Sequence, residues 1–463
     1  MFVGRKKELA ALEEMYEQDN FQMAIVYGRR RIGKTALLNE FIKDKNSLFF
    51  PAEEVNDSLN LQKFSQILGE KLGIQNFPAV RDWSALFAII AEKFSQAHLV
   101  LVIDEYPYAA TANKSLNSIL QHVIDYQFKQ SNIFLILCGS SMSFMENQVL
   151  GKKSPLFGRR TGQLKVNPLD YYDAAKFYPT ASNEEKVKYY ACVGGTPYYL
   201  SLINSKLNFQ KNLENLYFKM TGYLFNEGTL LMKQEFREPA NYNAVLQAIA
   251  SGANTLNEIV GFTQLESSVV SRYLVTLREL NYVERVVPFG ANPLKKKTSQ
   301  YQITENFLAF WYRYVFGVRG EIEQGNGTIY CLAAIQDLSD FIGPIFEEIT
   351  RQYLRRMNAV NKLPFIGKTF GKWWGKDKQS NVQEIDVVVE SLDSKQLLIG
   401  ECKWRDQFKV KQTVQHVNER ADLFTKYTCY KYLFTKLPIK LQDEEVVNVS
   451  VEDYFSRGLE PAN

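Results

Sequence analysis

The chain has 463 residues, of which 46% are hydrophobic, so it is long enough to bury more than one core. About three domains is the natural expectation for this length. Lysine and arginine total 55 and aspartate and glutamate 51, which leaves a net charge of +4. This small excess neither requires nor excludes a nucleic-acid partner, so local patterns must decide.

The five cysteines and three histidines are scattered, without the paired spacing of a zinc site. We therefore expect a reduced protein that holds no zinc. The N-terminal segment 1–7 is polar, and no apolar run approaches the length of a membrane span. The expectation is a cytoplasmic protein with no membrane partner.

A phosphate-binding loop lies near the start of the chain. Residues 28–35 read G-R-R-R-I-G-K-T, directly after the apolar run 23–27. A strand, a glycine-bounded turn and a helix start turn backbone N–H groups toward phosphate oxygens, while Lys34 reaches the β and γ phosphates and the Thr35 hydroxyl holds Mg²⁺. A plain glycine-rich surface turn would leave the arrangement around Lys34 unexplained. We expect a nucleoside triphosphate on Gly28, Arg29, Arg30, Arg31, Ile32, Gly33, Lys34, Thr35 and Ala36.

Two carboxylates end a later apolar strand. Asp104 would orient Mg²⁺ through its water shell, and Glu105 would polarise the water that attacks the γ phosphate. The alternative is that both cap the following helix. The upstream loop favours the catalytic role, and so predicts hydrolysis. Ser140 and Ser141 end the next strand, where either one senses the γ phosphate or caps a helix.

Adjacent arginines, Arg159 and Arg160, lie in the loop 154–161. They either supply charge to the transition state, as an arginine finger does, or form surface ion pairs.

The motifs of the first half, taken in order, resemble one known family. They are F-V-G-R-K-K-E-L, Y-G-R-R-R-I-G-K-T, I-D-E-Y, L-C-G-S-S, P-L-F-G-R-R-T and G-G-T-P-Y-Y-L. Their order and spacing resemble the archaeal-type ATPases, which belong to the AAA+/STAND-like branch of P-loop NTPases and also occur in bacteria. The resemblance implies an ASCE core that binds ATP and Mg²⁺, with residues 2–5 near the adenine. It also implies a lid helix that starts at 194–197 and reports the nucleotide state, although an ordinary helix start explains that turn too.

Three short helices and a two-stranded ribbon are predicted after residue 241, a pattern typical of a winged helix. If this unit binds DNA, four residues lie on the exposed face of the recognition helix and three lysines of the wing meet phosphates. These residues are Ser267, Ser268, Ser271, Arg272, Lys295, Lys296 and Lys297. The alternative is a packing or regulatory module, because this helix carries little positive charge.

A second chemical site is predicted near the end of the chain. Segments 384–390 and 397–404 read as the two strands of a hairpin. Because side chains alternate along a strand, Glu401 and Lys403 share one face and Asp386 opposes them. Carboxylates at that spacing bind Mg²⁺, and the lysine stabilises the attacking hydroxide or the pentacovalent phosphate. The pattern predicts metal-assisted phosphodiester hydrolysis.

This D…E-x-K pattern resembles the PD-(D/E)xK restriction-endonuclease-like superfamily. Archaeal-type ATPases commonly carry such a domain, of the DUF234 type, at this place. The resemblance implies an acidic residue on a preceding helix, here Glu347 or Glu348. Ile385 replaces the proline of the motif, while the metal-binding residues are intact. Gln415 and His416 either support the site or lie on a solvated helix face.

Lysines interleave with aromatic residues just before the proposed metal strand. They are Lys362, Lys368, Lys372, Lys376 and Lys378 with Phe365, Phe370, Trp373 and Trp374, opposed only by Asp377. Positive charge beside stackable rings favours a nucleic-acid backbone with exposed bases. The alternative is a solvated loop whose tryptophans pack on the sheet.

Together these patterns predict an α/β multidomain protein: a P-loop ATPase core at 1–170, a helical lid at 171–237, a winged helix-turn-helix at 238–305 and a nuclease-like domain at 306–463. The expected function is an ATP-driven switch that aligns a Mg²⁺-dependent nuclease-like domain on DNA. Its catalytic residues would be Lys34, Asp104, Glu105, Arg159, Arg160, Asp386, Glu401 and Lys403. One alternative holds DNA or a partner without cutting it, and another is an ATP-hydrolysing scaffold with no nucleic-acid role. A homo-oligomer would let an arginine act on a neighbouring subunit.

Overall fold

The computed structural model describes residues 2–292, 299–377 and 379–460. By their internal contacts they form two compact units, which meet in the chain between Pro168 and Leu169. The predicted end of the ATPase core, at residue 170, stays a prediction. The further division of the second unit at residues 237 and 305 stays a prediction.

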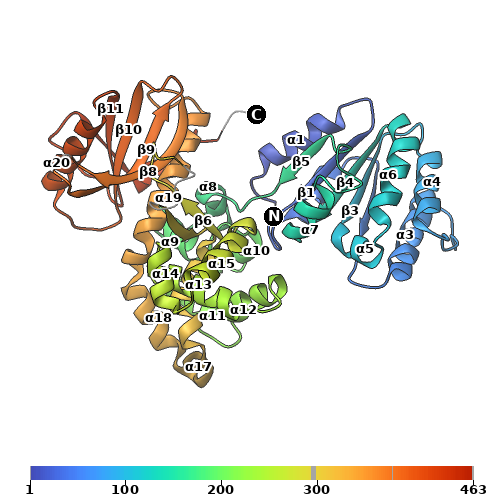
Figure 1. Ribbon diagram of the computed structural model, residues 1–463, viewed down its shortest axis with the longest axis horizontal. Helices are drawn as coiled ribbons and strands as arrows, with labels where there is room; N and C mark the ends of the chain where they lie inside the picture. Colours follow the sequence, from blue (N-terminus) through green and yellow to red (C-terminus); the bar gives the residue numbers. More distant parts are fainter. Residues whose placement is uncertain (1, 293–298, 378, 461–463) are drawn as a thin grey trace. The chain divides into compact units, whose positions relative to one another are not determined.

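The first unit is built on a five-stranded parallel sheet in the order β2-β3-β4-β1-β5 (Figure 1). The strands are β1 (Gln22–Tyr27), β2 (Ser47–Pro51), β3 (Leu99–Asp104), β4 (Ile133–Gly139) and β5 (Gly162–Lys165). The strands predicted before the phosphate-binding loop, before Glu105 and before Ser140 are confirmed as β1, β3 and β4. Every residue of β1, β3 and β4 is buried, as expected for the centre of a parallel sheet covered by helices.

The helices of this unit cover the sheet and begin where local side chains permit. They are α1 (Lys6–Tyr16), α2 (Lys34–Ile42), α3 (Asp57–Leu72), α4 (Trp83–Lys93), α5 (Tyr106–Ala112), α6 (Leu116–Tyr126) and α7 (Met142–Phe144). Asn56 and Asp82 accept hydrogen bonds from backbone N–H groups in the first turns of α3 and α4, which fixes those starts. Leu37, Leu38 and Phe41 of α2 pack on the sheet core, so the phosphate-binding loop stands on a rigid base.

The second unit starts with helices. They are α8 (Tyr171–Ala174), α9 (Asn183–Val193), α10 (Pro197–Leu200), α11 (Phe209–Tyr217), α12 (Tyr223–Glu235), α13 (Ala240–Ala250), α14 (Leu256–Thr263) and α15 (Ser267–Glu279). The last three match the helices predicted after residue 241. They are followed by an antiparallel ribbon of β6 (Val283–Val286) and β7 (Gln300–Ile303). The predicted wing lysines Lys295, Lys296 and Lys297 lie outside the described residues.

A second five-stranded sheet forms the C-terminal part, in the order β12-β11-β10-β9-β8 (Figure 1). Its elements are β8 (Gly367–Lys376), β9 (Val382–Ser391), β10 (Gln396–Lys403), β11 (Thr428–Thr435), β12 (Val446–Ser450), α20 (Val410–Ala421) and α21 (Val451–Tyr454). The predicted hairpin is confirmed as the antiparallel pair β9 and β10. Helices α16 (Asn306–Tyr314), α17 (Arg319–Glu321), α18 (Gly327–Gln336) and α19 (Leu338–Ala359) precede this sheet.

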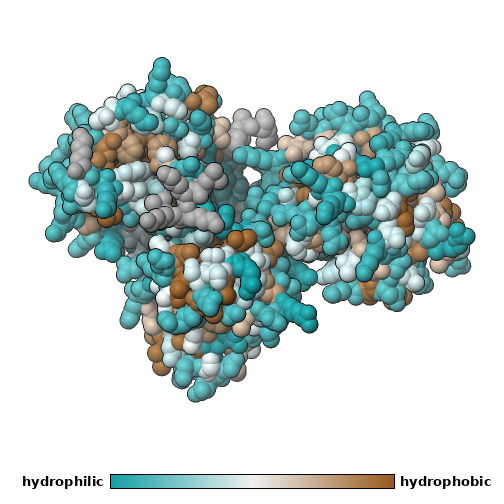
Figure 2. All heavy atoms as spheres, viewed as in Figure 1, coloured by the Kyte–Doolittle hydropathy of each residue, from teal (hydrophilic) through white to brown (hydrophobic). Residues whose placement is uncertain are grey.

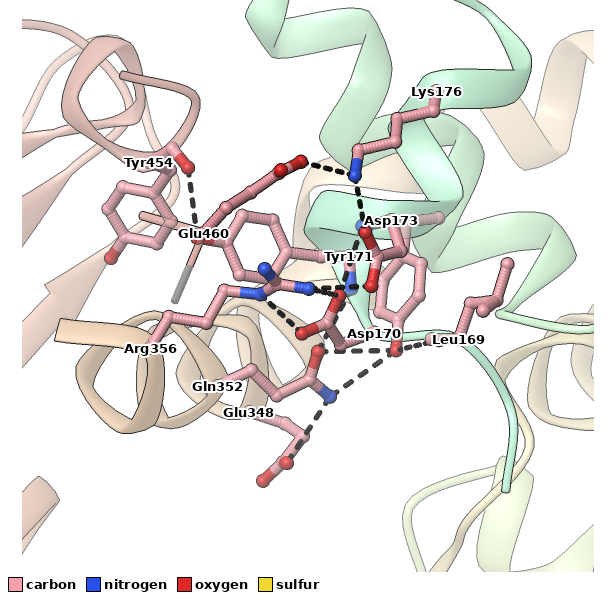
Figure 3. Close-up of polar contacts among 11 residues, drawn as sticks. Leu169, Asp170, Tyr171, Asp173, Lys176, Glu348, Gln352, Arg356, Tyr454 and Glu460 are labelled. Carbon is pink, nitrogen blue, oxygen red and sulfur yellow. Dashed lines mark hydrogen bonds and ion pairs between the residues drawn. The ribbon is translucent and has the colours of Figure 1, made fainter. Parts of the chain in front are cut away.

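Helix α19 links the helices that follow Leu169 with the second sheet. The Arg356 guanidinium contacts the carboxylates of Asp170 and Asp173, with the Nη2 to Asp173 Oδ2 distance at 2.8 Å (Figure 3). The Tyr171 N–H donates to Gln352 of α19, and its hydroxyl donates to the Tyr454 carbonyl at 2.9 Å. Because these contacts are partly or fully buried, they hold the start of α8 firmly against α19.

The surface is mainly hydrophilic, and exposed hydrophobic residues occur over it in small groups (Figure 2). Among the described residues, no single helix has both the length and the apolar composition of a membrane span. Segments 306–336 and 338–359 meet that test only together, as a pair bent by 56°.

Candidate functional site

The phosphate-binding loop joins β1 to α2 in a conformation that only particular residues adopt. Gly33 has φ 89° and Arg31 has φ 65°, both in the left-handed region. A Cβ on Gly28 would come within 2.4 Å of the Val166 carbonyl oxygen, so glycine alone fits there. Lys34 is buried, and its Nζ donates to the carbonyls of Gly28 and Arg29 at 3.0 Å. The loop is thus curled around its own lysine.

Neighbouring groups fix the outside of this loop. Arg5 is 6% exposed and donates from Nη2 to the Ile32 carbonyl at 2.9 Å, while Arg30 donates to the Tyr108 hydroxyl at 2.9 Å. Phe2 packs against the sheet core. The sequence did not predict that Arg5 would support the loop. Its place in the F-V-G-R motif was the available signal.

The two predicted carboxylates meet the loop at the end of β3. Thr35 Oγ1 donates to Asp104 Oδ2 at 2.7 Å, which brings together the two proposed Mg²⁺ ligands. Glu105 Oε2 accepts from the backbone N–H and hydroxyl of Ser140, at 3.1 and 2.8 Å. Glu105 precedes α5 but makes no side-chain capping bond to it. Ser140 therefore positions Glu105, and the capping alternative fails for that residue.

The adjacent arginines are engaged inside the first unit. Arg159 forms an ion pair with Asp125, with Nη2 to Oδ2 at 2.6 Å, and also donates to the Pro155 carbonyl. Arg160 donates weakly to the Leu150 carbonyl, at 3.4 Å. Of the two alternatives, ion pairing describes Arg159 in this structure.

The C-terminal residues predicted as a metal site gather around one cavity. It has a volume of about 560 Å³ and is lined by residues of α19, β9, β10 and α20. The lining contains Glu347, Asp386, Glu401 and Lys403, together with Glu384 and Arg420, which the sequence had not singled out. The Cys402 N–H donates to Asp386 Oδ2 at 2.8 Å, so the hairpin itself orients the aspartate.

Two carboxyl groups of this cavity have pKa values above their ordinary range. Burial raises the pKa of Glu347, and the nearby Asp386 raises it further. Burial likewise raises the pKa of Asp386, with the Glu401 carboxylate as the second cause. Desolvation and like charge both disfavour ionisation, so these groups hold protons at a pH where isolated carboxyls have lost them. A cation would reverse that penalty.

Glu401 is balanced differently, by cations of the chain itself. Its Oε1 accepts from Lys403 Nζ at 2.6 Å, and its Oε2 contacts Arg420 Nη1. Among the described residues, no three His, Cys, Asp or Glu side chains are grouped as metal ligands. Glu348, the other acidic candidate of α19, pairs with Arg351 at 2.9 Å. Arg351 in turn donates to the Asp386 carbonyl.

The remaining predicted contacts of this region are mostly structural. Gln415 bonds Glu419 on an exposed helix face, and neither Gln415 nor His416 lines the cavity. Trp373 packs against the core cluster around Ile385 and Val417, as the alternative expected of a tryptophan, but its segment forms strand β8 and not a solvated loop. Lys368 and Lys376 are exposed on β8, whereas Lys378 lies outside the described residues.

The ribbon after α15 is also engaged within the second unit. The Phe289 N–H donates to the Lys372 carbonyl of β8 at 2.8 Å, and its ring packs on the same core cluster as Trp373. On α15, Ser267, Ser268 and Arg272 are exposed and Ser271 is half-buried. The helix is therefore open to a partner, while this end of the ribbon is bound to the sheet.

A parallel α/β unit with a lysine-bearing loop between β1 and α2, and paired carboxylates after β3, defines a P-loop ATPase. Residues 2–203 match the model of an ATPase domain predominantly from Archaea. Residues 311–417 match a model described as archaeal and bacterial proteins of unknown function. The chain is 35% identical over 406 residues to Uncharacterized protein MJECL04 of Methanocaldococcus jannaschii, which covers 88% of each chain. It belongs to the archaeal ATPase family.

Two further similarities agree. The chain is 47% identical over 45 residues to Uncharacterized ATP-binding protein MJ0423 of the same organism, which is 10% of this chain and 76% of the relative. The Walker-type ATPase PABY2304 of Pyrococcus abyssi superposes with a TM-score of 0.53 at 18% identity, over 67% of this chain and 96% of that one. The second likeness shows a shared fold.

Proposed function

We propose that the first unit binds ATP with Mg²⁺ and hydrolyses it. The observation that carries this is the pair of contacts at the end of β3, where Thr35 meets Asp104 and Ser140 holds Glu105. The residues fit the ligand, because the left-handed turn at Gly33 exposes backbone N–H groups at the start of α2. Thr35 and Asp104 would hold the Mg²⁺, which supplies positive charge against the phosphates.

In this proposal each residue of the chain has one task. Lys34 leaves the Gly28 and Arg29 carbonyls to contact the β and γ phosphates. Glu105, oriented by Ser140, accepts a proton from the attacking water. Arg159 would act in trans within a homo-oligomer only after its ion pair with Asp125 opens.

We further propose that the second unit engages DNA and that its cavity is a Mg²⁺-dependent nuclease-like site. Buried carboxylates beside Lys403 support it, because Asp386 and Glu347 are paired in a way that a divalent cation would relieve. Asp386 and Glu401 would hold the cation, which would polarise a phosphodiester. Helices α13, α14 and α15 with the antiparallel pair β6 and β7 support a winged helix, in which the exposed side of α15 would face the DNA.

Helix α19 supports coupling between nucleotide state and this site. Arg356 and Gln352 hold the residues that follow Leu169, and Glu347 and Arg351 belong to the cavity and its border. A shift of the helical lid would therefore be transmitted through one rigid helix. This gives the proposed switch a physical route.

A second candidate function is binding of DNA or of a protein partner without cleavage. The observation that favours it is the double ion pair of Glu401, which occupies both oxygens of a proposed metal ligand. In that case Lys403 and Arg420 serve the fold and not a reaction.

Incubation of supercoiled plasmid with Mg²⁺ and ATP separates the two functions. The variants are Asp386→Ala with Glu401→Ala, and as a matched control Glu419→Ala with Asp422→Ala, which removes two carboxylates of the same domain outside the cavity. Nicking by the wild type and the control, but not by the first variant, supports cleavage. Equal nicking by all, or by none, leaves the non-cleaving function. A mobility-shift titration against salt then measures DNA binding directly.

A further inference from the structure

Arg420 contacts one of the two carboxylate oxygens through which Glu401 would hold a cation. It stands in the last turn of α20, and its guanidinium contacts Glu401 Oε2 while Lys403 contacts Oε1. The Glu401 residue is 8% exposed, so these two cations hold both carboxylate oxygens in a confined space. Both cations would repel a divalent ion at Glu401, so displacement of one of them would favour its binding.

Of the two cations, Arg420 would gain more from a new hydrogen-bond partner. Its Nε is buried and has no hydrogen-bond partner among the described residues, although the side chain lines the cavity. A buried donor without a partner is costly, so a movement of the side chain that pairs Nε with an oxyanion would relieve that cost. The planar guanidinium also matches two phosphate oxygens, which the single ammonium of Lys403 does not.

We propose that Arg420 exchanges partners: it holds Glu401 while the cavity lacks a cation, and moves to a phosphate oxygen of the substrate when a divalent cation takes its place. This inference rests on the proposed Mg²⁺ site. Arg420 is then a competitor of the cation and a positioning residue for the phosphodiester. The cation displaces Arg420 from Glu401, and the phosphodiester binds the displaced Arg420. Cation and phosphodiester therefore strengthen each other's binding by the same factor.

The test uses the full chain without nucleotide and measures binding of Mn²⁺ by calorimetry. The component of interest is the one that Asp386→Asn abolishes. Arg420→Gln should bind Mn²⁺ about tenfold more tightly than the wild type, the worth of roughly one charge-assisted hydrogen bond. Lys411→Gln, a change on the exposed face of the same helix, should leave this affinity as it is in the wild type.

Addition of a thymidine dinucleotide tests the second half of the proposal. It should tighten Mn²⁺ binding severalfold in the wild type and leave Arg420→Gln unchanged. Arg420→Lys should keep the weak Mn²⁺ affinity and lose most of the tightening, because it keeps the charge but not the fork of donors. This variant also shows that the effect does not come from a damaged fold.

Distinct results overturn the inference and the proposed function. Equal Mn²⁺ affinity in wild type and Arg420→Gln, or equal tightening by the dinucleotide, overturns the exchange while the metal site stands. Absence of an Asp386-dependent component in the wild type overturns the metal site itself, and the exchange with it.

Discussion

The two candidate sites of this chain both contain paired carboxylates, but they balance charge in opposite ways. In the first unit, Asp104 and Glu105 accept hydrogen bonds from the neutral hydroxyls of Thr35 and Ser140. In the second unit, Glu401 is neutralised by Lys403 and Arg420. A neutral donor orients a carboxylate and leaves its charge in place, whereas a cation orients the carboxylate and also neutralises it.

This difference has a chemical consequence. In the proposed function, the carboxylates near the loop would attract Mg²⁺ together with an incoming triphosphate. The C-terminal cavity is internally compensated, so a ligand there must break an existing pair or displace a proton. The comparison therefore predicts a site that responds directly to its ligand and a site that must first be unlocked.

The largest expected effect breaks the first site alone. Lys34→Ala removes the buried cation that contacts the Gly28 and Arg29 carbonyls. It should lower the rate of ATP hydrolysis by about 100-fold or more, because removal of one electrostatic donor typically costs that much. Steady-state phosphate release measures the rate, and calorimetry measures ATP affinity. Asp386→Asn serves as the control and should hydrolyse ATP as the wild type does. Unchanged triphosphate affinity in Lys34→Ala would contradict the proposal that this loop binds ATP.

The loop and its strands could be predicted because their information is local. Residues 28–35 specify the turn, and the all-apolar runs at 99–103 and 133–138 specify central strands of a parallel sheet. The hairpin at 382–403 was predictable for the same reason, since alternation placed Glu401 and Lys403 on one face. The order of the motifs in the first half of the chain also indicated the order of the strands and helices there.

Other features depend on contacts between distant residues. Arg420 lies on α20 and contacts Glu401 on β10. Ser140 follows β4 and contacts Glu105 at the end of the neighbouring strand β3. No spacing in the sequence indicates either pair. Trp373 lies in a lysine-rich segment that favours nucleic acid, yet its ring packs in a core cluster. Periodicity reports which face of an element is apolar, but not which charged group will meet it.

A medium effect is expected where α19 holds the start of α8. Arg356→Gln removes a partly buried double ion pair to Asp170 and Asp173, and should destabilise the second unit by about 1–3 kcal/mol. If the proposed coupling holds, this change should also make plasmid nicking independent of ATP, because movement of the proposed lid would no longer reach α19. Urea unfolding and the nicking assay with and without ATP measure the two effects.

Arg355→Gln is the matched control for that change. Arg355 is the neighbouring residue, is half-exposed, and lies at 3.7 Å from Glu348. Its loss should change stability by less than about 0.5 kcal/mol, as for other exposed ion pairs. A loss of ATP dependence in both variants would show that α19 carries no specific signal.

The smallest effect sharpens the comparison through pH. Burial and Asp386 raise the pKa of Glu347, so the folded protein holds a proton that the unfolded chain releases above about pH 4.3. The stability linked to this proton is fully present below that pH and is lost as pH rises through the folded pKa. Glu347→Gln cannot titrate, so its melting temperature should exceed that of the wild type by about 2 °C at pH 8 and by less at pH 5, as expected for ~1 kcal/mol. Glu348→Gln, which removes the pair with Arg351, should show no such gain with pH.

If a divalent cation binds in the cavity, Mg²⁺ should cancel the advantage of Glu347→Gln at pH 8, because it stabilises the ionised carboxylates of the wild type. Persistence of the full difference at saturating Mg²⁺ would mean that these carboxyls face each other for the fold alone, and the second site would then differ from the first in kind.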